Sequence, residues 1–171
     1  PLVGIEPAVK PAAQNHRGEK VAVMATPLTL HEEKFKQLVK RYENLATIIP
    51  VPCPDLVEYV EKGILEGPEL EGYLKDVLKP CLQEGVKAVV LGCTHFPLVK
   101  AAIGKVVGES VRIYDGGEGT ARQAKCLLAA KNLCTDQEKG HICFESSAPE
   151  KEAYYEALYR KAAHIDSRVK L

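Results

Sequence analysis

Short apolar runs alternate along this chain with longer segments of helical periodicity, and this alternation limits the possible folds more than any other feature of the sequence. Runs such as "KAVVLG", residues 87–92, have no polar face, which is typical of strands that are covered on both sides. The predicted strands are residues 2–5, 20–26, 47–51, 86–91, 111–115 and 141–145. We therefore predict an α/β fold in which a mainly parallel sheet is flanked by helices.

The segments between these runs carry apolar residues at the spacing of amphipathic helices. In residues 70–84, for example, Leu74, Val77, Leu78 and Cys81 fall on one helical face. The predicted helices are residues 28–44, 55–65, 70–84, 97–107, 119–133 and 149–163.

One polar stretch, "NLCTDQEKG" at residues 132–140, interrupts this pattern before the last predicted strand. Polar stretches rich in turn-forming residues are typical of connections between structural units. We therefore predict an α/β domain over residues 1–132, and a strand–helix segment over residues 133–171 that belongs to a second domain.

The charge balance argues against two classes of partner. The chain has 171 residues, with 23 basic and 23 acidic side chains that are interspersed rather than grouped. Such a surface offers no basic patch for nucleic acid or for an anionic membrane. No apolar stretch reaches the length of a membrane span, and no secretory signal opens the sequence. We expect a small molecule or a protein as the partner.

The six cysteines fall at irregular spacings without a CxxC pair. A disulfide framework is typical of short, loop-rich secreted chains, so a reducing, cytoplasmic location fits this pattern better. A metal site is disfavoured because Cys93 and His95 supply only two ligands, and no pair at zinc-site spacing supplies the others. The sequence implies no cofactor, since it lacks a P-loop, a full dinucleotide fingerprint and a lysine in a pyridoxal context.

The stretch "GCTH", residues 92–95, places a thiol, a hydroxyl and an imidazole at the end of a buried strand. Ligands of open α/β sheets bind beyond the carboxyl ends of the strands. Cys93 is predicted to lie near a helix start and beside His95, where both the helix dipole and a neighbouring cation favour thiolate. Such a thiol serves as a base or as a nucleophile; the alternative is that Cys93 fills the core and His95 is a satisfied loop residue.

The other cysteines are predicted to have no reactive role. Cys53 stands at a strand end, where we expect it to line the crevice without reacting. The remaining four are expected to be structural or incidental: Cys81, Cys126, Cys134 and Cys143.

Five stretches together carry a resemblance to a known family. They are "GIEPAVKPAA" at residues 4–13, "VAVMATPLTL" at 21–30, "VPCPDLVEYVEKG" at 51–63, "VVLGCTHFPL" at 89–98 and "YDGGEGTARQA" at 114–124. In this order they resemble the C-terminal part of the bacterial glutamate racemases, within the aspartate/glutamate racemase family. The final stretch, residues 141–158, resembles the family's closing segment, which returns from the second domain to pack on the first.

The resemblance implies an activity and roles for named residues. The family interconverts L- and D-glutamate without a cofactor and supplies D-glutamate for peptidoglycan. Two cysteines on opposite sides of the α-carbon exchange its proton, and Cys93 matches the one that acts on L-glutamate. By the same match, Thr94 and His95 bind the substrate and His95 assists the thiol. Thr29, and less surely Thr26, matches the family's threonine stretch.

The resemblance also assigns a role to one acidic residue, whereas the family's second catalytic cysteine has no counterpart in this sequence. Glu61, in "YVEKG", matches an acidic position that acts on the site indirectly, although spacing alone makes it a solvated helix residue. The family's other cysteine lies in an N-terminal stretch that has no match here. We therefore expect a missing N-terminal domain, an inactive isolated chain and, by resemblance, a homodimer.

Three alternatives stay open from the sequence. The chain could belong to an aspartate or hydantoin racemase of the same family. It could be a thiol enzyme of acyl transfer with Cys93 as nucleophile and His95 as base, although side chains at i and i+2 need not converge. It could also be a non-catalytic binding or interaction module that has the fold of this family.

Overall fold

The computed structural model describes residues 2–135 and 140–168, and it confirms the predicted α/β class. The described chain forms two compact units, Glu6–Gly116 and a second that consists of the segment up to Ile5 together with the chain from Gly117 onward. The first unit contains the sheet and every residue of the predicted site.

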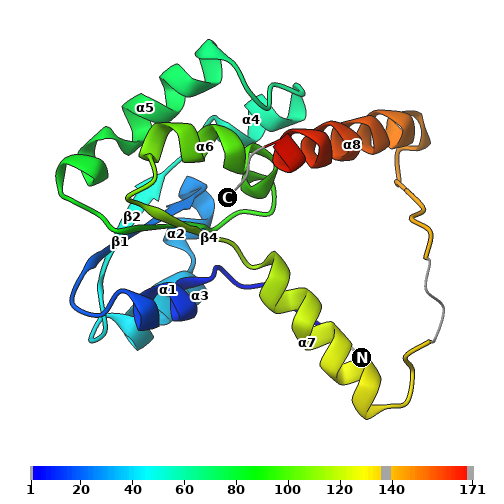
Figure 1. Ribbon diagram of the computed structural model, residues 1–171, viewed down its shortest axis with the longest axis horizontal. Coiled ribbons are helices and arrows are strands. Elements are labelled where there is room, and N and C mark those ends of the chain that lie inside the picture. The colour runs from blue at the N-terminus through cyan, green and yellow to red at the C-terminus, as the bar shows by residue number, and fades with distance from the viewer. Residues whose placement is uncertain (1, 136–139, 169–171) are drawn as a thin grey trace. The chain divides into compact units, whose positions relative to one another are not determined.

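The first unit is a four-stranded sheet with strand order β2-β1-β3-β4 (Figure 1). Its strands are β1 (Lys20–Ala25), β2 (Thr47–Pro52), β3 (Ala88–Leu91) and β4 (Arg112–Tyr114). All three pairings are parallel; Val21 is in register with Ile48 of β2 and with Ala88 of β3. Because parallel neighbours need a crossover, helical segments connect each strand to the next.

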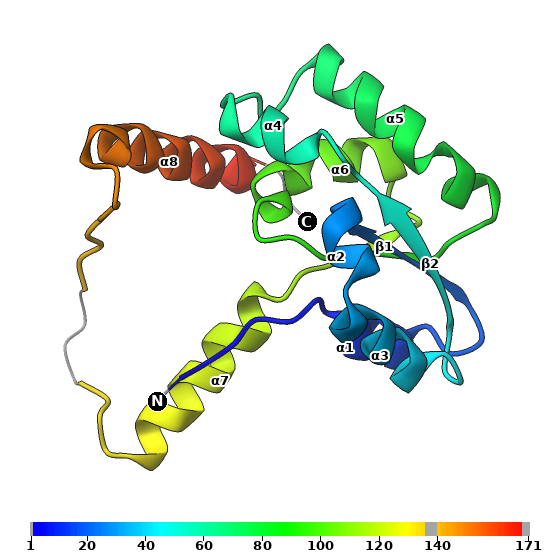
Figure 2. The ribbon, with the colours of Figure 1, turned by 180° about the vertical axis from the view of Figure 1, so that it is seen from behind.

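Helices cover both faces of this sheet (Figures 1 and 2). In chain order they are α1 (Val9–Asn15), α2 (Pro27–His31), α3 (Glu33–Tyr42), α4 (Leu56–Glu61), α5 (Pro68–Gln83), the 3-10 helix η1 (Phe96–Val99) and α6 (Lys100–Val107). α1 and α3 lie side by side on one face, whereas α5 and α6 lie on the other.

The strands supply alternate residues to the two layers of the core. Val21, Val23, Ala88 and Val90 are buried in one cluster with residues of α1 and α3. The intervening residues point to the opposite face, as strand geometry requires. There the buried leucines of α5, Leu70, Leu74 and Leu78, form the second layer. Burial of apolar surface on both faces stabilises the parallel sheet.

Two of the six predicted strands are wrong. Residues 2–5 and 141–145 form no strand, and none of their apolar residues is buried, with Leu2 97% and Ile142 65% exposed. A strand is stable only when its backbone groups pair with a neighbour, and apolar alternation over so few residues does not supply one. The other four strands are confirmed within two residues at each end.

The helices also differ in detail from the prediction. Residues 28–44 form two helices because Glu32 is extended, with φ −65° and ψ 137°, and it separates α2 from α3. The segment at 97–107 begins as η1 and becomes α-helical only at Lys100. α1 was not predicted; it has only 7 residues and contains Pro11 in its first turn, yet it buries Val9, Ala12 and Ala13.

The second unit contains α7 (Gly117–Ala130), the 3-10 helix η2 (Pro149–Lys151) and α8 (Glu152–Arg168). Its start at Gly117 differs from the domain boundary predicted near residue 132, and the domain division of the intact protein stays a prediction. Within the described residues, the structure contains no helix with the length and hydropathy needed to cross a bilayer.

Candidate active site

The centre of the sheet has a topological switch point between β1 and β3. The chain leaves β1 toward β2 on one side, whereas it leaves β3 toward β4 on the other. Ligands of open α/β sheets bind in the crevice that such a reversal creates at the carboxyl ends of the strands. Thr26 directly follows β1, and Gly92 with Cys93 directly follows β3. Thr26 and Cys93 therefore lie at the sheet edge where open α/β sheets generally bind ligands.

Gly92 allows the two central strands to stay together up to this edge. Its N–H donates to the carbonyl oxygen of Met24 at 2.8 Å. A Cβ atom at this position would lie 2.7 Å from that same oxygen and 3.3 Å from Cβ of Ala25. Since both obstacles belong to the backbone or to a short side chain, only glycine fits, and it sets the start of the loop that carries Cys93.

Three side chains form a connected chain beside this edge. Sγ of Cys93 lies 3.8 Å from Nδ1 of His95, and Nε2 of the same ring lies 3.0 Å from Oε1 of Glu61. Cys93 and His95 come from the loop after β3, whereas Glu61 is the last residue of α4. The structure therefore brings together the thiol, the imidazole and the acidic residue that the sequence predicted.

The contact between Cys93 and His95 differs from one expectation of the sequence. Side chains at i and i+2 need not converge, but here the tight turn before η1 brings them together. Phe96 N–H donates to the Cys93 carbonyl, and Leu98 N–H donates to the His95 carbonyl, so the loop is folded by i to i+3 bonds. The predicted helix start beside Cys93 is this 3-10 turn rather than the first turn of an α-helix.

The Glu61 contact fixes the role of each ring nitrogen of His95. A carboxylate only accepts hydrogen bonds, so the nitrogen that faces an ionised Glu61, Nε2, carries the proton. Nδ1 is then free to accept the proton of the Cys93 thiol. The side chains of His95 and Glu61 are 33% and 41% exposed, so solvent screens their attraction and it contributes at most about 1 kcal/mol to stability. The arrangement orients the ring more than it stabilises the fold.

A second polar group stands at the end of the neighbouring strand. Oγ1 of Thr26 accepts from the N–H of Thr29 at 3.3 Å, and the two hydroxyl oxygens lie 3.0 Å apart. Thr26 thus caps α2, which follows β1. Thr94 lies between Cys93 and His95 and its side chain is exposed.

The other cysteines have different surroundings, and all six are free. Cys53, at the end of β2, is fully buried, and burial raises the pKa of its thiol to about 12. Cys81 is buried on α5, where burial likewise raises the pKa of its thiol. Cys126, Cys134 and Cys143 are exposed, and Cys143 lies outside any strand, contrary to the prediction. Cys93, by contrast, is half-buried and keeps access to solvent.

Two contacts in the first unit were not predicted from the sequence. Nζ of Lys100, the first residue of α6, lies 3.0 Å from Oδ2 of Asp115 after β4, and both side chains are less than one quarter exposed. The hydroxyl of Tyr73, on α5, accepts from the N–H of Asp55 at 3.3 Å. Neither carried a sequence signal, because each depends on a contact between distant elements.

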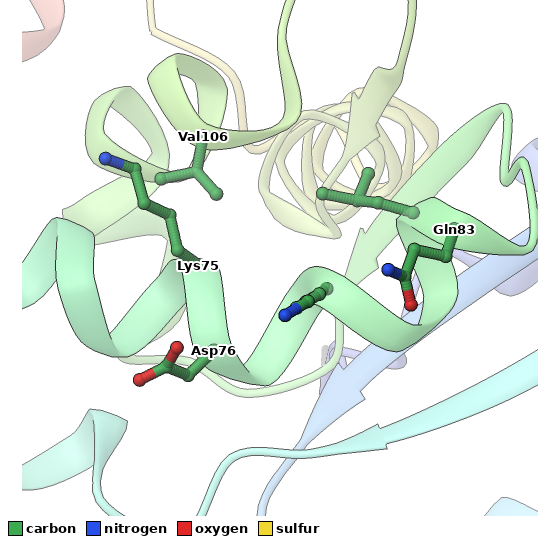
Figure 3. Close-up of a pocket in the computed structure, with 6 residues that line it drawn as sticks. Lys75, Asp76, Gln83 and Val106 are labelled. Carbon is green, nitrogen blue, oxygen red and sulfur yellow. The ribbon is translucent and has the colours of Figure 1, made fainter.

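A groove between α5 and α6 lies apart from these groups (Figure 3). It is lined by Lys75, Asp76, Lys79, Leu82, Gln83 and Val106. The predicted site residues, all of which are in the described part of the chain, are not among them. Its lining carries mixed charge and no cysteine or histidine, so it offers none of the chemistry found beside Cys93.

Comparison with known proteins agrees with the family resemblance of the sequence. Residues 1–124 match the family model described as Asp/Glu/Hydantoin racemase. The glutamate racemase of Clostridium kluyveri is 48% identical over 139 residues, which cover 81% of this chain and 54% of that protein. The chain therefore spans about half the length of the curated relatives it matches.

Solved structures are similar as well. The Escherichia coli glutamate racemase, in complex with L-glutamate and the activator UDP-MurNAc-Ala, has a TM-score of 0.75 and 31% identity. That match covers 94% of this chain and 62% of the other. The Francisella tularensis glutamate racemase, in complex with D-glutamate, has a TM-score of 0.62 and 26% identity, covering 75% of this chain and 47% of the other. The fold, the motifs and these matches agree that the chain belongs to the Asp/Glu/Hydantoin racemase family.

Proposed function

We propose that the intact protein is a glutamate racemase and that this chain supplies one of its two proton-transfer thiols, Cys93. The observation that carries the proposal is the contact of Cys93 with His95, whose ring is in turn held by Glu61, at the switch point of the sheet. Family membership supports it, as do relatives named glutamate racemase. Solved relatives that hold L-glutamate and D-glutamate support the choice of substrate.

The thiol and the imidazole act together in the proposed proton transfer. Nδ1 of His95 accepts the thiol proton, which leaves a Cys93 thiolate next to an imidazolium. The thiolate removes the α-proton of L-glutamate, and a second thiol on the opposite face of the α-carbon delivers a proton to give D-glutamate. In the reverse direction Cys93 is the thiol that donates. Glu61 keeps the ring in the tautomer and orientation that this cycle needs.

Substrate binding in this proposal uses the hydroxyl groups at the two central strand ends. Thr94, beside Cys93, and Thr29, after β1, provide hydroxyl donors for the carboxylates of glutamate, and His95 contributes the positive charge of its imidazolium form. Such donors stabilise the carbanion that forms when the α-proton leaves, because negative charge spreads into the α-carboxylate.

The second thiol is proposed to lie in sequence that precedes Pro1. This chain then carries a half-site and is inactive alone, and residues 133–171 return to the N-terminal domain of the intact protein. We also propose that the intact enzyme is a cytoplasmic homodimer that supplies D-glutamate for peptidoglycan. The six free cysteines support a reducing compartment.

The test is incorporation of solvent deuterium at the α-carbon, measured by NMR and mass spectrometry, when the intact protein is mixed with glutamate in deuterated water. The proposal requires incorporation into glutamate and slower or no incorporation into aspartate. Faster incorporation into aspartate would favour the aspartate type of racemase. A covalent acyl adduct on Cys93, without exchange, would favour the nucleophilic thiol enzyme, and neither result would favour a binding module.

A further inference from the structure

The helix that carries Glu61 has little intrinsic stability. α4 has only 6 residues, and its N-cap residue, Asp55, makes no side-chain capping bond. Isolated helices of this length are unstable in water, so tertiary contacts must hold α4 in place. Leu56 and Val60 are fully buried and supply one such contact on its inner side. These apolar contacts are non-directional and do not by themselves fix how far the helix end reaches toward His95.

A tyrosine from a different helix holds the other end of α4. The hydroxyl oxygen of Tyr73, on α5, accepts from the N–H of Asp55 at 3.3 Å. This bond satisfies one of the backbone donors that a helix N-terminus leaves open. The ring of Tyr73 also packs on that of Tyr59, with centroids 5.2 Å apart and planes inclined at 39°. Tyr73 therefore contacts both the start and the middle of the helix.

The surroundings of Tyr73 keep its hydroxyl in the neutral form. Burial raises the pKa of this phenol to about 12, so it remains protonated throughout the physiological range. A neutral hydroxyl accepts a backbone N–H while its own proton points elsewhere. The contact is therefore independent of pH where an enzyme of this family would work.

We propose that Tyr73 is a positioning residue which, by holding the N-terminus of α4, sets the contact of Glu61 with His95. The proposal rests on the proposed function for its effect on rate, but its structural part does not. The contact of Glu61 with His95 is 3.0 Å long, and hydrogen bonds weaken steeply beyond about 3.5 Å. A small shift of α4 is enough to lengthen it beyond that limit.

The test compares four variants of the intact protein: Tyr73→Phe, Glu61→Gln, the double variant, and Tyr114→Phe as the matched control. The Tyr114→Phe variant also loses one hydroxyl contact, the hydrogen bond that Asn15 Nδ2 donates to Tyr114 at 3.2 Å. This contact involves neither α4 nor the site. Three quantities are measured: kcat/KM for glutamate, hydrogen exchange of the Asp55 N–H, and the ring 15N signals of His95.

We expect Tyr73→Phe to lower kcat/KM by about three- to tenfold, mainly through kcat, since misplaced catalytic groups cost rate rather than binding. The Asp55 N–H should exchange faster, and the His95 signals should move in the direction seen for Glu61→Gln. The double variant should be no slower than Glu61→Gln alone, because Tyr73 acts through Glu61. Tyr114→Phe should change none of the three quantities.

Additive losses in the double variant, or His95 signals that Tyr73→Phe leaves in place, would overturn the proposal. If the parent protein racemises no substrate, the proposed function fails. The exchange and 15N measurements then still decide whether Tyr73 positions Glu61.

Discussion

Nε2 of His95 lies 3.0 Å from Oε1 of Glu61, although the two residues are separated by 34 positions in the sequence. Both side chains are partly open to solvent, so their attraction adds little to the free energy of folding. The opposite ring nitrogen faces the thiol of Cys93. The imidazole therefore links the carboxylate to the thiol, and in the proposed function Glu61 acts on Cys93 through this ring.

Replacing Glu61 by glutamine should separate orientation from stability. We expect Glu61→Gln to lower kcat/KM roughly ten- to hundredfold, because the ring loses the carboxylate that selects its tautomer. The free energy of unfolding in urea should change by less than about 1 kcal/mol. Glu58→Gln is the control, because Glu58 lies on the same helix and its carboxylate pairs with the exposed Lys62 at 3.3 Å. Equal rates for Glu61→Gln and Glu58→Gln would contradict this role.

The two threonines after β1 should give different kinds of defect. Thr26→Val removes the oxygen that caps α2 and should lower the free energy of unfolding by about 1 kcal/mol. Thr29→Val keeps its N–H on that cap, and should raise KM for glutamate by about tenfold through loss of a hydrogen bond to a charged group. Steady-state kinetics and urea denaturation of both variants test this. The reverse pattern would remove Thr29 from the substrate site.

Gly92 and Gly104 should respond in opposite ways to substitution by alanine. In Gly92→Ala the new Cβ meets the Met24 oxygen at 2.7 Å, so the ends of β1 and β3 must separate, and we expect a loss of about 1–3 kcal/mol. In Gly104→Ala, within α6, the nearest atom is Cδ1 of Ile113 at 3.8 Å, and the better helix former should add up to about 1 kcal/mol. Urea denaturation measures both; a neutral Gly92→Ala variant would refute the close approach.

The buried thiol of Cys53 should make stability fall at alkaline pH. Burial raises its pKa from 9.0 to about 12 in the folded protein, so between these values the unfolded chain releases the proton first. The contribution is complete below pH 9 and is lost as pH rises toward 12. Stability of the parent should therefore decline more steeply with pH than that of Cys53→Ala. Part of the decline should remain in the variant, since the pKa values of Tyr73 and Cys81 are raised as well.

The central sheet could be predicted from the sequence because its strands are apolar on both faces. Runs such as residues 86–91 bury every side chain from Ala88 to Leu91, and this leaves a clear composition signal. The two wrongly predicted strands, residues 2–5 and 141–145, show the limit of the same signal. An apolar sequence pattern does not indicate whether a partner strand is available for pairing. The separation of α2 from α3 at Glu32 and the short helix α1 depend on local backbone geometry, which hydrophobic periodicity does not predict.

The site was only partly accessible to sequence reasoning. The position of Cys93 at a strand end follows from the pattern, but Glu61 looked like a solvated helix residue, and only the family resemblance singled it out. Its contact with His95 is created by the packing of α4 against the loop after β3. Tyr73 and the pair of Lys100 with Asp115 carried no local signal, because each contact joins elements that are distant in sequence.

Hydrogen exchange at the α-carbon of each glutamate enantiomer by Cys93→Ser, in the intact protein, tests the central claim most directly. The serine hydroxyl is a far poorer base near neutral pH, whereas the small change in volume should leave the fold intact. We predict that exchange from L-glutamate fails while exchange from D-glutamate continues through the other thiol, with racemisation lost in both directions by circular dichroism. Near-normal racemisation by Cys93→Ser would contradict the account and make Cys93 a structural residue.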